Sequence, residues 1–191
     1  MIEEERNRIM DYIITEAAPK EAEEILEYLK IVGSETDNLS FGAEGLLVSA
    51  EAEAAYLKST LDSPVSAMFL AKRNGRIIGN AHFTGFTKER MKHRGTFGIS
   101  VIKEEWGKGV GSHLLEEILA FAKNEVHAEI ISLEVRSNNA RAIGLYKKYG
   151  FEKIGEFKGF TKVDGQYLDF DLMNLYIEPD TAGQDGVSDT P

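Results

Sequence analysis

The sequence predicts an α/β protein of the α+β type, in which helices pack on a mixed β-sheet. Three observations support this class. Strand-like apolar runs alternate with amphipathic helix-like runs along most of the chain. An Asn74-Gly75 pair separates two apolar runs and indicates an antiparallel hairpin. The second half follows a β-α-β-α-β-β order, whose two β-α crossings are expected to be parallel and right-handed.

In the first half, apolar spacing and turn residues define each expected element. Gly33 is the expected stop of the first helix, and Ser49 is the expected N-cap of the second. The expected elements are a strand at 11–16, a helix at 17–32, a loop at 34–45, a helix at 49–61, and hairpin strands at 67–72 and 77–86.

In the second half, Gly150 is the expected end of the last helix, and Asp164-Gly165 is the expected turn of a final hairpin. The expected elements are a strand at 95–102, a glycine-rich turn, a helix at 114–126, a strand at 129–136, a helix at 139–149, and strands at 151–162 and 166–177. We therefore expect an extension at 1–10, one domain at 11–177, and a disordered acidic tail at 178–191.

Composition excludes several functions. The absence of cysteine rules out a cysteine acyl-enzyme, a disulfide framework and thiolate metal sites. The net charge of −10 argues against a nucleic-acid partner and favours a cationic or amine partner, unless it only aids solubility. The four histidines lack metal-ligand spacing, so no metal is expected. Without a membrane-spanning apolar run or a signal-peptide pattern, we expect a cytoplasmic protein.

The most informative segment is the glycine-rich turn, where Gly107, Gly109 and Gly111 alternate between a strand and a helix. Such a turn presents free backbone N–H groups at the positive end of a helix dipole, which is a common phosphate site. Glycine allows positive φ and lets an anion approach the backbone. Alone the signal is weak, because glycine-rich turns are common.

A second group of polar residues follows. Glu134 lies on the polar face of an alternating strand, and Asn139 and Tyr146 are seven residues apart on the next helix. We expect the three side chains to converge near the end of the sheet. The carboxylate would accept a proton from an attacking amine, directly or through water, and the phenol would protonate a departing thiolate. Each residue also has an ordinary structural explanation: a solvated strand residue, a helix cap and a core aromatic.

Together the two motifs resemble the GCN5-related N-acetyltransferase (GNAT) superfamily, in particular its ribosomal-protein N-terminal acetyltransferase-like members. The resemblance covers about 11–177. Its most specific parts are Gly-Lys-Gly-Val-Gly-Ser at 107–112 and Leu-Glu-Val-Arg…Asn-x-x-Ala-Ile-x-Leu-Tyr-x-x-x-Gly-Phe at 133–151. It implies an acyltransferase enzyme (EC 2.3.1.-) with a central sheet splayed between strands 95–102 and 129–136, flanked by about four helices, with acetyl-CoA in the split.

The resemblance also implies residue roles. Tyr146 would be the general acid and Glu134 the general base. Pantetheine would contact Ile99, Ser100, Val101 and Asn139, and the pyrophosphate would contact backbone N–H groups of Gly107, Lys108, Gly109, Val110, Gly111 and Ser112. Trp106 departs from the Gln or Arg that often begins the family's phosphate motif. Lys108 either supplies a charge or is a solvated loop residue.

The leading hypothesis is an N-acetyltransferase that moves acetyl from acetyl-CoA to a primary amine by direct attack in a ternary complex. The alternative is a non-catalytic acyl-CoA-binding sensor or interaction module, although a sensor would need only the phosphate site. The acceptor, a small-molecule or peptide amine, is not identified: protein N-termini, amino-acid-like antibiotics and polyamines remain open. The last hairpin offers a strand that pairs across a possible homodimer.

Overall fold

In the computed structural model, which describes residues 11–177, seven strands form one mixed sheet in the order β1-β2-β3-β4-β5-β7-β6. The predicted extension at 1–10 and tail at 178–191 lie outside the described residues. The strands are β1 (Ile13–Glu16), β2 (Ser66–Arg73), β3 (Arg76–Gly85), β4 (Arg94–Val101), β5 (Ile130–Arg136), β6 (Glu152–Val163) and β7 (Gln166–Tyr176).

The sheet opens between its two parallel neighbours, β4 and β5. Their ladder has only three residue pairs, from Arg94↔Ile130 to Thr96↔Ser132. From Phe97 onward β4 keeps its antiparallel partner β3, and β5 keeps its antiparallel partner β7. One edge of β4 is therefore without a strand partner over 97–101, as the predicted splayed sheet requires.

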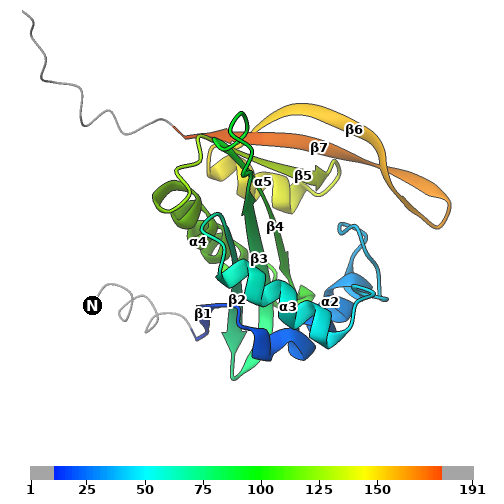
Figure 1. Cartoon of the computed structure of the whole chain (residues 1–191). Coiled ribbons are helices and arrows are strands. Elements are labelled where there is room, and N and C mark those ends of the chain that lie inside the picture. The colour runs from blue at the N-terminus through cyan, green and yellow to red at the C-terminus, as the bar shows by residue number, and fades with distance from the viewer. Residues whose placement is uncertain (1–10, 178–191) are drawn as a thin grey trace, which may run out of the picture.

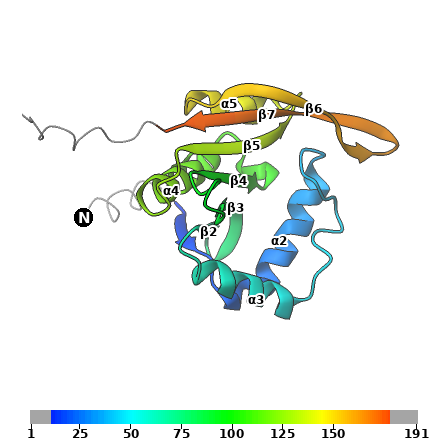
Figure 2. The same cartoon turned by 45° about the horizontal axis from the view of Figure 1, so that its top comes forward.

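Four α-helices cover the sheet within the described residues: α2 (Ala22–Glu35), α3 (Ala50–Leu61), α4 (Val110–Asn124) and α5 (Ala140–Lys148). A short 3₁₀ helix, η1 (Pro19–Glu21), precedes α2, and another, η2 (Lys103–Glu105), precedes the glycine turn. In Figures 1 and 2, α2 and α3 lie on one side of the sheet, and α4 and α5 lie on the other.

Aromatic contacts establish which helices share a face. Phe83 and Phe97 are paired neighbours on β3 and β4, so their side chains lie on one face. Phe83 contacts Phe121 of α4 in an edge-to-face arrangement with ring centroids 5.9 Å apart. Phe97 contacts Tyr146 of α5 in the same way at 5.7 Å. These contacts join α4 and α5 to the sheet in one apolar layer.

Most turn signals in the sequence are confirmed. Asn74 and Gly75 adopt φ of 52° and 80°, and Asp164 and Gly165 adopt φ of 47° and 80°, as tight hairpin turns require. The Ser49 hydroxyl caps α3 by accepting from the Ala52 N–H at 3.2 Å. The expected loop after the first helix contains no regular helix or strand, and it extends from 36 to 49.

Two local expectations need correction. The helix α4 begins at Val110, inside the glycine turn, and not at 114, because Gly109 already serves as its N-cap. The second β-α crossing joins β5 to β6, which run parallel as expected because both are antiparallel to β7, and β7 of the final hairpin inserts between them. The predicted pairing of that hairpin across a homodimer remains a prediction.

The second correction concerns Gly33, which was expected to end the first helix. The helix α2 continues through Gly33 to Glu35. A Cβ at this position would lie 2.0 Å from the carbonyl oxygen of Gly42. Gly33 is therefore a contact point at which the 36–49 loop packs directly on the helix backbone, and this contact positions the loop beside the opening between β4 and β5.

Replacing Gly33 with alanine should destabilise the fold by about 1–3 kcal/mol, because the loop must move to admit the methyl group. Urea unfolding curves would measure the change. The matched control is Gly144→Ala in α5, where nothing besides the helix's own backbone and the adjacent residues lies within 4 Å of the added Cβ. The control should be as stable as the parent, or more stable by about 0.5–1 kcal/mol. A Gly33→Ala protein as stable as the control would contradict the contact.

Candidate active site

A cavity of about 580 Å³ lies where β4 leaves β5. Its wall is built from four segments: the end of α2 and the residues after it, the unpaired part of β4, the glycine turn with the start of α4, and the start of α5. The lining residues are Val32, Thr36, Asn38, Leu39, Ile99, Ser100, Val101, Glu105, Trp106, Gly107, Gly109, Gly111, Ser112, Asn138, Asn139, Ala140, Arg141, Ala142, Leu145 and Tyr146.

The glycine turn forms one end of the cavity. Gly107 and Gly109 adopt φ of 79° and 89°, a left-handed conformation that residues other than glycine disfavour. In α4 the His113 N–H donates to the Gly109 carbonyl at 3.1 Å, so the amides just before His113 begin the helix and have no partner within it. The helix dipole adds positive potential at this end. The turn therefore has the donors and the field of an anion site.

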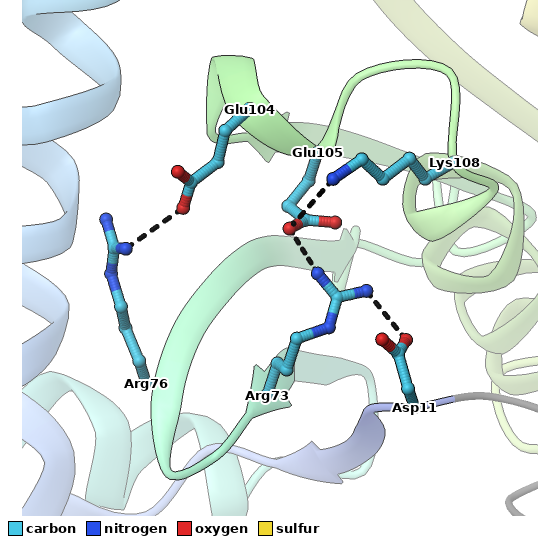
Figure 3. Close-up of polar contacts among 6 residues, drawn as sticks. All are labelled: Asp11, Arg73, Arg76, Glu104, Glu105 and Lys108. Atoms are coloured by element: carbon cyan, nitrogen blue, oxygen red, sulfur yellow. Dashed lines mark hydrogen bonds and ion pairs between the residues drawn. The ribbon is translucent and has the colours of Figure 1, made fainter.

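Ion pairs hold the segment that leads into this turn in place (Figure 3). Arg73, at the end of β2, donates to the Glu105 carboxylate through Nη1 and to Asp11 through Nη2 at 2.7 Å. The Glu105 side chain is only 5% exposed, and Lys108 Nζ lies 3.5 Å from the same oxygen. These hydrogen bonds, first that to Glu105, raise the pKa of Arg73. Glu105, which leads into the turn, is thus fixed to the β2–β3 hairpin.

Tyr146 lies on the wall formed by α5. Its ring packs between Phe97 and Phe151, with centroid separations of 5.7 and 5.8 Å. Burial alone raises the pKa of its phenol to about 12. The phenol is therefore protonated at neutral pH and, among the described residues, has no hydrogen-bond partner. It is a proton donor that faces a cavity.

Asn139 is the N-cap of α5, where its Oδ1 accepts from the Ala142 N–H at 3.2 Å. The capping role that the sequence left open is thus present, and the Nδ2 donor group remains for a ligand. On β4, the Ser100 hydroxyl lies 3.0 Å from the Tyr28 hydroxyl of α2. Burial raises the pKa of Tyr28, so this pair stays neutral and holds α2 against β4.

Three of the predicted site residues do not line the cavity. Val110 is fully buried in the core, so only its backbone faces the turn. Lys108 points to Glu105 (Figure 3). Glu134 is exposed on β5, on the face opposite its buried neighbours Leu133 and Val135. The structure brings Asn139 and Tyr146 to one cavity, as expected, but it places Glu134 outside that cavity.

The position of Glu134 still relates to the opening in the sheet. The β4–β5 register pairs Thr96 with Ser132, and two more residues of the same register would place Gly98 level with Glu134. Glu134 is therefore at the base of the split, on the face that carries α2. At the end of β5 on the same face, an Arg136 guanidinium nitrogen lies 3.8 Å from an Asp37 carboxylate oxygen of the loop after α2.

Arg141 is a cavity residue that was not predicted from the sequence, and it contacts Trp106. The Arg141 guanidinium lies over the Trp106 ring, 4.4 Å from its centroid. The Trp106 indole N–H donates to the Val101 carbonyl at 2.7 Å, so the ring is fixed to the end of β4. Arg141 follows Asn139 by two residues, a spacing that should have drawn attention to it, since both lie in the first turn of α5.

Two features are absent from the described part of the chain. No group of three or more His, Asp or Glu side chains is arranged to hold a metal ion. None of the helices within 11–177 is both long enough and apolar enough to span a membrane.

Comparison with known proteins identifies the class. Residues 34–151, more than half of the chain, match the acetyltransferase (GNAT) family. The chain belongs to this family. Its predicted fold and its predicted class, an acyltransferase enzyme, are confirmed at that level.

Particular relatives agree. The chain is 33% identical to the L-amino acid N-acetyltransferase AaaT of Escherichia coli over 108 residues, covering 56% of this chain and 67% of that protein. It is 30% identical to the N-alpha-acetyltransferase RimI of Mycobacterium tuberculosis, covering 55% and 64%. A GNAT-family acetyltransferase structure from Streptococcus pneumoniae aligns over 87% of this chain and 99% of that chain, with a TM-score of 0.83 and 32% identity.

Replacing Arg73 with glutamine should destabilise the protein by about 1–3 kcal/mol, because the buried Glu105 carboxylate would lose its main partner. The matched control is Arg76→Gln on the same hairpin. Arg76 pairs with Glu104 at 2.9 Å, and both side chains are more than half exposed. Surface pairs of this kind contribute little, so the control should keep its urea midpoint. Equal midpoints for the two variants would show that Glu105 does not depend on Arg73.

Proposed function

We propose that this protein is an N-acetyltransferase that moves acetyl from acetyl-CoA to a primary amine by direct attack in a ternary complex. The observation that carries the proposal is the cavity in the split sheet. It joins an anion site at the glycine turn to a buried, protonated phenol through one unpaired strand edge.

The residues present fit acetyl-CoA as the co-substrate. Backbone N–H groups of Gly107 and of 109–112 would hold the pyrophosphate, whereas the Lys108 N–H already donates to the Glu105 carbonyl at 3.3 Å. The unpaired edge of β4 from Ile99 to Val101 would bond the amide-bearing pantetheine arm like an added strand, and the Asn139 amide would assist. One lone pair of the Val101 carbonyl is already bonded to Trp106, so the other remains for the arm.

The proposed reaction needs two proton movements. The amine nitrogen attacks the thioester carbonyl carbon, a C–N bond forms and the C–S bond breaks. The amine gives up one proton and the leaving sulfur gains one, so the products are an N-acetyl amide and free CoA thiol. We assign proton donation to Tyr146. The burial that raises the pKa of the phenol to about 12 also raises the pKa of the leaving thiol, because it disfavours the charged thiolate. Proton transfer from the phenol to the sulfur therefore remains feasible.

We assign the role of general base to Glu134. Glu134 lies where the split between β4 and β5 begins, level with Gly98, and this position supports a role in accepting the proton of an amine that enters from that face. Because Glu134 is exposed and does not line the cavity, a water molecule is the simplest carrier of the proton between the amine and the carboxylate.

The acceptor is proposed from the relatives. One is named for N-acetylation of L-amino acids and the other is an N-alpha-acetyltransferase, so α-amines of amino acids and peptides are the first acceptors to test. The decisive experiment incubates the protein with acetyl-CoA and a panel of such amines while free thiol is measured. Thiol release that depends on an amine supports the enzyme. Acetyl-CoA binding without turnover across the panel would favour the sensor.

Gly109→Val should lower acetyl-CoA affinity at least tenfold, about 1.4 kcal/mol. A branched side chain disfavours the positive φ of Gly109 and would hold the phosphate away from the backbone. Titration calorimetry measures the affinity. The control is Gly165→Val in the distal hairpin turn, which has φ of 80° and open space around it. If the two variants bind equally well while folded, the turn is not the phosphate site.

Tyr146→Phe should reduce turnover by roughly a hundredfold or more, within the range for loss of a general acid, while acetyl-CoA affinity changes little. The ring and its contacts with Phe97 and Phe151 are retained, so only the proton is lost. The measurement is kcat with the best acceptor of the panel. A rate equal to the parent's would overturn the assigned chemistry but leave the fold and the cofactor in place.

The companion variant is Glu134→Gln. It should slow turnover most at neutral pH and recover in part at high pH, where the amine deprotonates without help. A uniform loss at every pH would indicate that Glu134 only positions the acceptor.

A further inference from the structure

One cation in the cavity has no role in the proposed chemistry. Arg141 lies in the first turn of α5 and lines the cavity, where its guanidinium stacks on Trp106 at 4.4 Å. Trp106 directly precedes Gly107 at the start of the glycine turn, so the stacked guanidinium lies beside the proposed phosphate site.

A polyanion bound at this end of the cavity would need a cation that is not already paired. The chain carries a net charge of −10, and the buried carboxylate of Glu105 lines the cavity itself. Arg73 and Lys108 already pair with Glu105 (Figure 3). Arg141, in contrast, has no carboxylate within ion-pair distance among the described residues. It is therefore the cavity arginine that is available to an added anion.

The stack also determines how Arg141 presents its donors. A guanidinium lying on an aromatic face exposes its N–H edge to the side and keeps little freedom to rotate. The indole beneath it is itself fixed by the 2.7 Å bond to the Val101 carbonyl. The arginine is thus held in place before any ligand arrives, which lowers the entropy lost on binding.

We propose that Arg141, oriented by Trp106, binds the pyrophosphate of the co-substrate from the side opposite the glycine turn. The pyrophosphate would then lie between the backbone amides of the glycine turn and a planar, bidentate donor on α5. This assignment deepens the proposed function and rests on it. It makes Arg141 a binding residue and Trp106 a positioning residue.

Calorimetric titration of the purified full chain with CoA and with dephospho-CoA tests the proposal. Dephospho-CoA keeps the pyrophosphate and lacks the 3′-phosphate. Arg141→Gln should weaken binding of both ligands by a similar factor, about tenfold, and should reduce the dependence of affinity on salt. Lys148→Gln on the same helix removes the same charge from a lysine that does not line the cavity, and it should change neither quantity.

A double-mutant cycle tests the part played by Trp106. In the Trp106→Leu background, Arg141→Gln should cost clearly less than tenfold, because the unstacked arginine is no longer held over the site. An undiminished cost in that background would remove Trp106 from the proposal.

Other outcomes have separate meanings. A loss with CoA that disappears with dephospho-CoA would overturn the pyrophosphate assignment and move Arg141 to the 3′-phosphate. An Arg141→Gln protein that binds both ligands as well as Lys148→Gln would overturn the role of Arg141 altogether, while parent binding would still support the proposed function. Failure of the parent protein to bind either ligand would instead overturn the proposed function.

Discussion

The separation of β4 from β5 after Thr96 is the constraint on which the site depends. Two parallel strands that continued to pair would satisfy each other's backbone groups and leave no space between them. Here the ladder ends after three residue pairs, and each strand keeps only its outer partner. The N–H and C=O groups on the open edge of β4 then need a partner from elsewhere. An amide-bearing ligand can supply one, and the same opening admits it.

Contacts between distant parts of the chain hold the elements around the opening in place. The Arg73–Glu105 pair links the β2–β3 hairpin to the segment that leads into the glycine turn. The Tyr28–Ser100 contact holds α2 to β4, and Gly33 lets the loop after α2 pack closely on that helix. On the other face, Phe97 and Phe151 enclose Tyr146. These contacts keep the cavity walls in place without a strand between them.

The charge arrangement is unusual for a site that would receive a polyanion. The protein is acidic overall, and a buried carboxylate lies beside the proposed phosphate site. Glu105 is tolerated because Arg73 neutralises its charge. The ion pairs of Glu105 with Arg73 and Lys108 make the turn rigid, but the positive charges of these two side chains are then not available to a phosphate. Backbone amides at the start of α4 provide donors that need no side-chain charge. The family match at 34–151 spans the glycine turn, Glu134 and Tyr146.

Local signals in the sequence are sufficient to predict the order and kind of nearly all elements. The Asn74-Gly75 and Asp164-Gly165 turns, the Ser49 cap and the alternation along β5 depend on neighbours within a few residues. The alternating glycines and the Asn139–Tyr146 spacing also indicated two walls of the cavity. Which side chains meet depends instead on how the elements pack in three dimensions. Gly33 was misinterpreted because its partner, Gly42, lies in another segment. The insertion of β7, the position of Glu134 outside the cavity, and the stacking of Arg141 on Trp106 likewise depend on contacts between elements that no local pattern encodes.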